Sequence, residues 1–263
     1  ANRFDPLSEE LDGSQHVACD AEGNLYVSLQ GQTMQVWKLS PKGKVLQKFG
    51  KAGGRPLLGT FDPTGMLNPY GIAVDKNGRL WVAEADPKPK RYSVWNPNGT
   101  LWKEFFGSID YSTRAVCDPE KPEIVYMQGV RYLVDYEQGT WKVDATPIRG
   151  GDLGEGVRLE DQGNHGGGYV VVVKGRRFLW TGSTLWELDG DRAVPRMSLF
   201  EAKRLETPVG KNGKPGKPKE VKVRQVWIDT NNDGRVQAEE KRDAKTVPAY
   251  YLGLPMDRHL NLY

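Results

Sequence analysis

The stretch Pro69-Tyr70-Gly71-Ile72-Ala73-Val74-Asp75-Lys76-Asn77-Gly78-Arg79-Leu80-Trp81-Val82-Ala83 decides the fold. It reads as a hydrophobic strand that ends in Asp, a turn that contains Gly, and a second hydrophobic strand. Residues 16–28 repeat this pattern, with Asp20 and Gly23 at the matching positions. Internal repetition of a short strand-turn-strand unit indicates an array of small β-sheets.

Each of these copies continues into a second half, at 91–103 and at 34–46. Short aliphatic and aromatic runs alternate there with turns rich in Asn, Pro and Gly, which is typical of hairpin-linked antiparallel strands. Two more degenerate copies follow within 115–143 and 169–190. Four short strands in a unit of about 40 to 45 residues predict one propeller blade, with loop insertions such as 51–68.

The predicted fold class is all-β, a β-propeller of four-stranded antiparallel blades that this chain does not necessarily complete. Helical spacing of apolar residues is absent over long windows, and 31 Gly with 17 Pro disfavour helices. The pattern at 69–83 resembles the NHL repeat of six-bladed β-propellers and lacks the Gly-His and Trp-Asp pairs of WD40 repeats. The resemblance is good in two copies, fair in the third and poor after residue 150. It implies a fold and hardly any function.

We expect residues 1–263 to form a single β-propeller domain or part of one. The blade-like repeats are predicted at about 14–54, 69–110, 113–150, 165–204 and 221–263, with a Lys-rich loop at 207–220. Residues 254–263 read like the opening of a further blade, and a propeller closes to hide its edge strands. We therefore expect the chain to be part of a larger polypeptide or assembly; the alternative is that the tail completes the first blade as a closing strand.

Composition limits the partners. The net charge is +3, from 37 basic and 34 acidic residues, which gives no case for nucleic acid. The most basic stretch, 211–219, is rich in Gly and Pro, which favours a solvated loop over an anion-binding patch. The sequence contains no run of 18 apolar residues, so no membrane span is predicted.

Cys19 and Cys117 occupy the same position in two different repeats. We therefore expect two small buried side chains without a disulfide.

The segment 229–240 matches the twelve-residue EF-hand calcium loop at every diagnostic position. Hard oxygen ligands, which Ca²⁺ prefers, are offered at loop positions 1, 3, 5, 9 and 12, and position 7 contributes a backbone carbonyl. The predicted ligands are Asp229, Asn231, Asp233, Arg235, Gln237 and Glu240. Gly234 at position 6 allows the sharp turn. We expect a structural calcium ion, because three carboxylates leave no obvious open position for catalysis.

The flanks of this loop depart from the EF-hand family. Residues 221–228 read as a strand where the family has a helix, while a short helix over 238–242 is expected after the loop. The segment therefore resembles the strand-loop-helix calcium loops of extracellular β-proteins. The alternative is a lengthened blade turn, in which Asp229 aligns with Asp75 and Gly234 with Gly78.

Other recurring residues have structural interpretations. Asp20, Asp75 and Asp118 share one repeat position, where Asp accepts hydrogen bonds from turn amides, so we prefer that role to a ring of acids. Trp37, Trp95, Trp141 and Trp186 recur near the end of the third strand and are expected to pack between blades rather than bind sugar. The other four, Trp81, Trp102, Trp180 and Trp227, lie inside predicted strands and are expected in the core.

Two glycine-rich segments, 150–156 and 163–168, are interpreted as long connections on one propeller face. Neither follows a strand into a helix, so a phosphate-binding loop is not indicated. Binding residues favour such loops. The candidates are Asp152, Glu155, Asn164, His165 and His16. His16 and His165 both precede an expected inner strand, and one propeller lyase family of the NHL type binds zinc with channel histidines.

The leading hypothesis is a secreted or periplasmic bacterial β-propeller module that binds a partner protein or a glycan through loops on one face, with a structural calcium site. The alternative is a lyase or hydrolase that acts on a carbohydrate or lactone with a divalent metal in the central channel. A third hypothesis is a structural subunit of a larger assembly. Convergence of acidic, amide or histidine side chains at the channel mouth would distinguish the enzyme.

Overall fold

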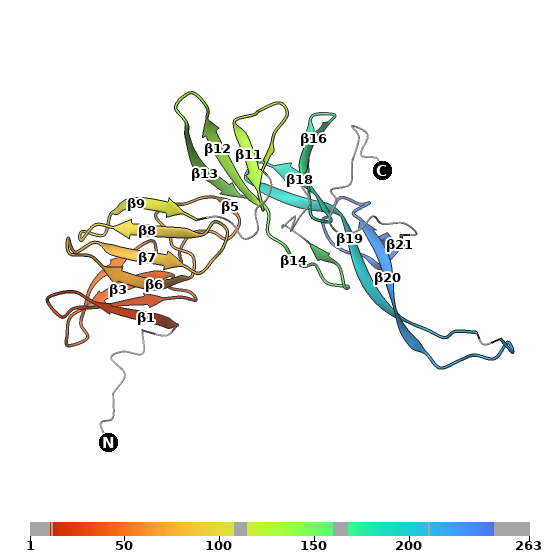
Figure 1. The fold of residues 1–263 in the computed structure, drawn as a ribbon, viewed down its shortest axis with the longest axis horizontal. Coiled ribbons are helices and arrows are strands. Elements are labelled where there is room, and N and C mark those ends of the chain that lie inside the picture. Colours follow the sequence, from red (N-terminus) through yellow and green to blue (C-terminus); the bar gives the residue numbers. More distant parts are fainter. Residues whose placement is uncertain (1–10, 12, 108–114, 160–167, 210, 245–263) are drawn as a thin grey trace, which may run out of the picture. The chain divides into compact units, whose positions relative to one another are not determined.

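The computed structural model describes residues 11, 13–107, 115–159, 168–209 and 211–244. Its regular structure is antiparallel β-strand, and the helix η2 (Ala238–Glu240) is a single 3-10 turn. Within those ranges, no helix has the length and apolar character needed to cross a bilayer. The chain divides into two compact units, Ala1–Asp110 and Tyr111–Tyr263 (Figure 1).

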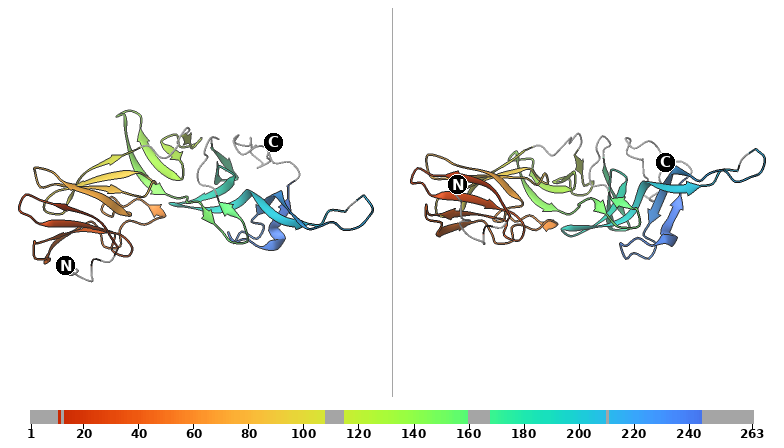
Figure 2. Two further views of the ribbon diagram at one scale, coloured as in Figure 1. Left: turned by 60° about the horizontal axis from the view of Figure 1, so that its bottom comes forward. Right: turned by 90° about the horizontal axis from the view of Figure 1, so that it is seen from below.

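The first unit contains two four-stranded antiparallel sheets in which strands pair in sequence order. The orders are β1-β2-β3-β4 and β6-β7-β8-β9, and Figure 2 shows the sheets from two further directions. The strands are β1 (Ser14–Cys19), β2 (Leu25–Leu29), β3 (Gln35–Leu39), β4 (Val45–Phe49), the short β5 (Gly59–Thr60), β6 (Pro69–Val74), β7 (Leu80–Glu84), β8 (Arg91–Trp95) and β9 (Leu101–Phe106). This is the blade architecture of a β-propeller, as the repeat predicted.

The core of the first unit lies between its two sheets. Tyr26 and Val36 of the first sheet belong to one buried cluster with Leu80 and Val82 of the second. Trp95, expected to pack between blades, lies in the same cluster at 2% exposure. Because successive side chains of a strand point to opposite faces, the apolar positions of the repeat supply this buried surface.

The Asp that follows the first strand of each clear repeat caps the turn behind it. Asp75 Oδ1 accepts hydrogen bonds from the backbone N–H of Asn77 at 2.8 Å and of Arg79 at 3.0 Å. Asp20 and Asp118 accept hydrogen bonds from amides of their own turns in the same way. The structural interpretation of these three residues is confirmed.

A buried ion-pair network anchors the insertion 51–68, and the sequence analysis did not indicate it. Glu84 Oε2 contacts Arg55 Nη2 at 3.0 Å, and Glu84 Oε1 contacts Arg91 Nη1 at 2.7 Å. These three side chains are at most 1% exposed. Glu84 also accepts a hydrogen bond from the Leu67 backbone N–H at 3.0 Å, and Arg91 Nε contacts Glu104 at 2.6 Å. One carboxylate thus holds the insertion against β7 and β8.

The second unit contains a four-strand run β10-β11-β12-β13, the hairpin β14-β15, and a six-stranded sheet in the order β16-β17-β18-β19-β20-β21. The strands are β10 (Val116–Cys117), β11 (Ile124–Met127), β12 (Val130–Asp135), β13 (Thr140–Thr146), β14 (Gly151–Asp152), β15 (Arg158–Leu159), β16 (Tyr169–Val173), β17 (Arg176–Thr181), β18 (Thr184–Asp189), β19 (Arg192–Glu206), β20 (Lys219–Ile228) and β21 (Lys241–Asp243). A buried cluster containing Tyr126, Trp186 and Trp227 forms its core.

Several side chains differ from the sequence-based expectations. Trp102, expected in the core, is 46% exposed, and Trp141, expected to pack between blades, is 52% exposed. Each lies on the last strand of its repeat, β9 or β13, where fewer neighbours cover it. Cys19 and Cys117 are free thiols as expected, but they are exposed rather than buried. Both lie on the first strand of a repeat, with side chains directed away from the core.

The helix expected after the calcium loop is shorter than predicted. The turn η2 includes only Ala238–Glu240, and the next residues belong to β21 (Lys241–Asp243), which pairs with β20. The strand expected over 221–228 lies within β20. Strands β20 and β21 extend the sheet of β16–β19, while the proposed fifth repeat, 221–263, runs beyond the described residues and stays a prediction.

Candidate metal-binding loop

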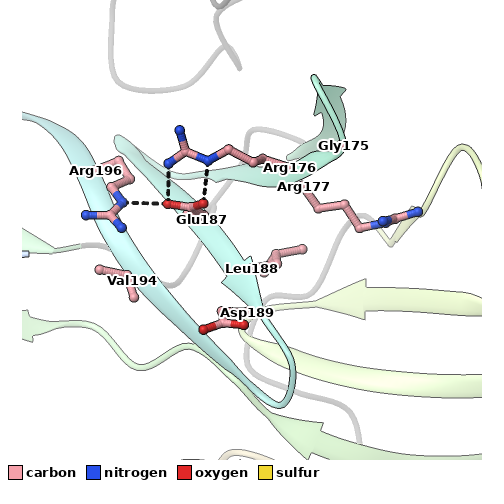
Figure 3. Close-up of a pocket in the computed structure, with 8 residues that line it drawn as sticks. All are labelled: Gly175, Arg176, Arg177, Glu187, Leu188, Asp189, Val194 and Arg196. Atoms are coloured by element: carbon pink, nitrogen blue, oxygen red, sulfur yellow. Dashed lines mark hydrogen bonds and ion pairs between the residues drawn. The ribbon is translucent and has the colours of Figure 1, made fainter. Parts of the chain in front are cut away.

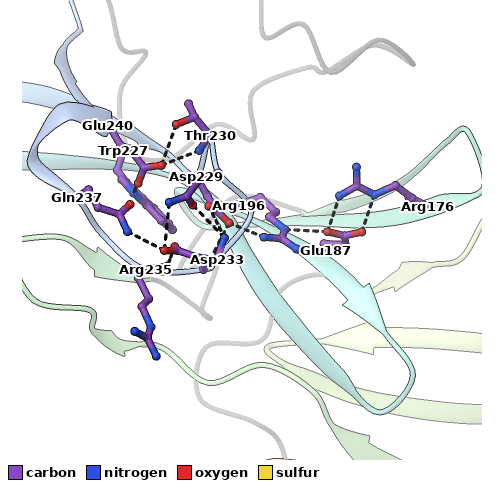
Figure 4. Close-up of polar contacts among 12 residues, drawn as sticks. Arg176, Glu187, Arg196, Trp227, Asp229, Thr230, Asp233, Arg235, Gln237 and Glu240 are labelled. Atoms are coloured by element: carbon purple, nitrogen blue, oxygen red, sulfur yellow. Dashed lines mark hydrogen bonds and ion pairs between the residues drawn. The ribbon is translucent and has the colours of Figure 1, made fainter.

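The loop 229–240 connects β20 to β21, and its first residue directly follows β20. Asp229 is 7% exposed, and both its carboxylate oxygens accept hydrogen bonds (Figure 4). Oδ1 accepts from the backbone N–H of Asp233 at 3.0 Å, and Oδ2 accepts from that of Gly234 at 3.0 Å. Asp229 therefore caps its loop as Asp75 caps a blade turn, although it reaches further along the chain.

The sharp turn expected in this loop is present. Asn232 and Gly234 have left-handed backbone, with φ of 63° and 68°. Gly adopts this region without steric cost, and Asn adopts it more readily than other residues. The backbone amides that follow the turn therefore point towards the carboxylate of Asp229.

Asp233 organises the middle of the loop. Its Oδ2 accepts hydrogen bonds from Asn231 Nδ2 at 3.1 Å and from Gln237 Nε2 at 2.8 Å. Its Oδ1 accepts from the backbone N–H of Arg235 at 2.8 Å, and this bond is the main cause of the lowered pKa of the Asp233 carboxyl. The Arg235 side chain points away from Asp233, so it does not compete for this carboxylate (Figure 4).

Glu240 ties the end of the loop to its beginning. It is 4% exposed, and its Oε2 accepts a hydrogen bond from Trp227 Nε1 at 2.9 Å. Its Oε1 accepts from the backbone N–H of Thr230 at 2.8 Å and from the Thr230 hydroxyl at 2.9 Å. Burial acts to raise the pKa of Glu240, but these hydrogen bonds outweigh it, so the pKa is lowered and the carboxylate stays ionised.

Gln237 leaves an acceptor unsatisfied. Its amide nitrogen donates to Asp233, whereas its Oε1 is buried and has no hydrogen-bond partner among the described residues. An unpaired buried acceptor costs about 1–3 kcal/mol, so such an atom normally contacts a water molecule or an ion. Gln237 is the ninth residue of the loop, the position that binds Ca²⁺ directly or through water.

The donor chemistry of the loop fits a hard cation. An oxygen of a carboxylate or an amide has two lone pairs, and four oxygens accept a single hydrogen bond each: Asp229 Oδ1, Asn231 Oδ1, Asp233 Oδ1 and Glu240 Oε2. Across the described part of the chain, however, no three His, Cys, Asp or Glu side chains are grouped closely enough to hold a metal ion. The loop thus has suitable oxygens, with Glu240 directed towards Trp227 and Thr230.

An ion-pair chain links this loop to a pocket on the six-stranded sheet. Arg196 Nη1 contacts Asp229 Oδ2 at 2.5 Å, and Arg196 Nε contacts Glu187 at 2.7 Å. Arg176 donates hydrogen bonds to both carboxylate oxygens of Glu187, at 2.6 and 2.7 Å (Figures 3 and 4). This pairing lowers the pKa of Glu187. Arg196 is therefore shared between the loop and the pocket.

The pocket itself has a volume of about 290 Å³ and lies over β17, β18 and β19. Its lining is Gly175, Arg176, Arg177, Glu187, Leu188, Asp189, Val194 and Arg196. All three arginines are already paired with acids, Arg177 with Asp118 at 2.9 Å. The pocket therefore has no uncompensated positive charge to draw in an anionic ligand.

The structure brings only part of the predicted binding set together. Asp152 and Glu155 share the β14–β15 hairpin, and Lys241 Nζ contacts the Glu155 backbone carbonyl at 3.0 Å and its carboxylate at 3.3 Å. The hairpin thus joins the end of the candidate calcium loop. His16 is exposed on β1 of the first unit. Asn164 and His165 lie outside the described residues.

Two functional contacts of the loop were missed by sequence reasoning. Trp227 was assigned to the core, and its burial is confirmed, but its indole N–H also fixes Glu240. Arg196 was not singled out, because its approach to Asp229 depends on the pairing of Met197 with Ile228 across β19 and β20. Only that register places Arg196, the residue before Met197, beside Asp229, the residue after Ile228.

Comparisons with known proteins find distant similarity. No protein-family model and no curated protein sequence matches the chain, so the NHL type of the repeat stays a prediction. A gluconolactonase from Xanthomonas campestris is 14% identical over 69% of this chain, with a TM-score of 0.26, and the chain spans 61% of that enzyme. The PQQ-bound aldose sugar dehydrogenase of Streptomyces coelicolor is 11% identical (89% of this chain, 93% of that one, TM-score 0.27). The PQQ domain of pyranose dehydrogenase from Coprinopsis cinerea is 12% identical (85% and 52%, TM-score 0.27).

Proposed function

We propose that the chain is a β-propeller module that binds a partner protein or a glycan, and that one Ca²⁺ ion in the loop 229–240 stabilises it. The observation that carries the proposal is the buried Gln237 Oε1, an acceptor without a protein partner at a predicted calcium position. Ca²⁺ takes six to eight oxygen ligands, and this loop is rich in them. A secreted or periplasmic location is part of the proposal, since the strand before the loop and the short helical turn after it resemble the calcium loops of extracellular β-proteins.

The residues that would hold the ion have separate duties. Asp229, Asn231, Asp233, Gln237 and Glu240 would supply side-chain oxygens, and Arg235 its backbone carbonyl. Asp229 and Glu240 also hold the loop closed through hydrogen bonds to Gly234 and Thr230, so their removal would damage the loop even without metal. Asp233 is exposed and its hydrogen bonds stay within the loop, whereas Asp229 and Glu240 also contact Arg196 and Trp227 of the sheet, so Asp233 is the better residue to change.

Thermal unfolding in excess EDTA and then in excess Ca²⁺, Mg²⁺ or Zn²⁺ tests this proposal. An ion that binds only the native state stabilises it by about 2.7 kcal/mol at a concentration 100-fold above Kd. We expect Ca²⁺ to raise the unfolding temperature, and the Asp233→Ala variant to lose that increase.

Glu239→Ala is the matched control, because it removes one exposed carboxylate from the same loop at a position that is not a ligand. It should respond to Ca²⁺ like the unmodified protein. Identical unfolding curves in EDTA and Ca²⁺ would show that the loop binds no calcium and is a lengthened blade turn. Equal losses in both variants would indicate general charge screening instead of a site.

The proposal assigns the β14–β15 hairpin to the binding surface. Asp152 is exposed there, and Glu155 of the same hairpin is tied to Lys241 at the end of the loop. Calcium would therefore order the hairpin through β21. A glycan array probed in Ca²⁺ and in EDTA, with Asp152→Ala beside the unmodified chain, reads out glycan binding by this face.

A further inference from the structure

Strands β19 and β20 continue as a two-stranded arm beyond the rest of their sheet. β18 pairs with β19 only as far as Ser198, and β21 pairs with β20 from Gln225 to Trp227. The pairing of β19 with β20, in contrast, runs on from Glu201 and Arg224 to Glu206 and Lys219. The arm, residues 201–224, extends past the other strands of its sheet in every view (Figures 1 and 2).

The arm carries the positive charge of the molecule. It contains eight basic residues and three acidic ones, a net charge of 8 − 3 = +5, whereas the whole chain has +3, so the remainder has 3 − 5 = −2. The three acids pair with basic residues of the arm itself: Glu220 with Lys203, Glu201 with Lys222, and Glu206 with Arg204. The tip, 207–219, has four lysines and no acid.

The arm also exposes aliphatic side chains. Leu205 is 75% exposed and Val209 is 76% exposed, more than any other large hydrophobic residue that the structure describes. They lie where the strands end and the lysine-rich tip begins. A two-stranded ribbon is only marginally stable alone in water, so a surface that covers these side chains would stabilise it.

The composition of the arm selects among anionic partners. Single-stranded nucleic acid is bound by stacking on aromatic side chains, and the arm contains none. Bidentate recognition of phosphate uses Arg, whereas all four basic residues of the tip are Lys, which act as point charges. Addition of a peptide strand is opposed by Lys and Pro along the edges. Clustered lysines beside exposed aliphatic residues fit an anionic lipid surface.

We propose that the tip of the arm binds the surface of an anionic lipid bilayer, with Lys211, Lys214, Lys217 and Lys219 facing the headgroups and Leu205 and Val209 entering the boundary with the acyl chains. Every described residue of the tip is exposed, which leaves the lysines available. Composition alone favoured a solvated loop over an anion-binding patch at 211–219, and the exposed Leu205 and Val209 are the added observation. The proposal does not depend on calcium, since none of these residues belongs to the loop 229–240.

Sedimentation of the full chain with vesicles tests the proposal. Phosphatidylcholine vesicles with about 30% phosphatidylglycerol are compared with phosphatidylcholine alone, in EDTA. Each lysine near an anionic surface contributes a factor of about five to binding, so the combined variant Lys211→Gln, Lys214→Gln, Lys217→Gln and Lys219→Gln should bind at least about 100-fold more weakly. The matched control changes four exposed lysines elsewhere to Gln: Lys42, Lys44, Lys76 and Lys121. It should retain most of the binding.

A second variant separates lipid from other polyanions. Leu205→Ser with Val209→Ser should weaken vesicle binding several-fold and leave retention on a heparin column unchanged. Circular dichroism checks that both arm variants keep the strand content of the parent. The proposal would be overturned if the chain bound neutral and anionic vesicles equally, or if the lysine control lost as much vesicle binding as the tip variant. It would also be overturned if the change of Leu205 and Val209 to Ser left vesicle binding unchanged.

Discussion

Buried ion pairs hold the insertion 51–68 against strands β7 and β8, and Glu84 lies at their centre. Replacing Glu84 by Gln would leave the guanidinium groups of Arg55 and Arg91 buried without their common carboxylate. Arg55 Nη1 already lacks a partner among the described residues, and burial, the main cause, lowers the pKa of Arg55. Breaking a buried ion pair from one side costs about 3–5 kcal/mol. We therefore expect Glu84→Gln to lower the free energy of unfolding in urea by about that amount.

The matched comparison is Glu220→Gln, which removes an acid from a pair with Lys203 in which both side chains are more than half exposed. A solvated pair of this kind contributes little, so the unfolding free energy should hardly change. Equal effects of the two substitutions would show that Glu84 is not a structural centre.

Residue roles were predictable where they recur with the repeat. The capping role of Asp20 and Asp75 follows from their shared place before a turn. Glu84 and Arg91 occur once, within strands whose other residues fit the blade pattern, so nothing in the sequence marked them as an ion pair. A contact between residues on neighbouring strands becomes visible only when the register is known.

The insertion 51–68 is also held by close backbone packing, which makes Gly54 a sensitive position. Its φ is +73°, and a Cβ there would lie 2.2 Å from the Met66 backbone oxygen. Gly139 has a similar φ of +64°, yet a Cβ there would meet no atom within 4 Å. We expect Gly139→Ala to cost about 1–2 kcal/mol of conformational strain, and Gly54→Ala more than about 4 kcal/mol.

Urea unfolding of both alanine variants measures this difference directly. The shared left-handed backbone cancels in the comparison, so the excess at Gly54 reports steric overlap alone. Similar costs at the two positions would mean that the insertion yields locally and does not restrain the fold.

At the scale of elements, the strands and turns of the first two repeats follow from the sequence pattern, because alternation and Asn, Pro and Gly turns agree there. The arm was harder to predict. Residues 192–206 contain Pro195 and many charges, and a fourth repeat was expected to end near 204, whereas β19 continues to Glu206 and pairs with β20. Long-range pairing, rather than local preference, keeps these charged residues in a strand.

Across the whole molecule, the proposed calcium ion should act on one unit. The loop 229–240 contacts β19 through Arg196 and β20 through Trp227, and Lys241, which directly follows the loop in β21, contacts Glu155 of the β14–β15 hairpin. Binding to the native state lowers the population of locally open states that include the site. Hydrogen–deuterium exchange should therefore slow on Ca²⁺ addition at the amides of β20, β21 and the β14–β15 hairpin.

The same experiment contains its own control, because none of the described calcium-loop contacts involves β1–β4 or β6–β9. Exchange in those strands should be equal in EDTA and Ca²⁺, and Asp233→Ala should abolish the protection in the second unit while leaving the first unchanged. Uniform protection of all sheets would point to an ion that acts on the chain as a whole. If β20 and β21 were protected and the β14–β15 hairpin were not, calcium binding would have no effect on the proposed binding face, because the contact of Lys241 with Glu155 is what connects the loop to the hairpin.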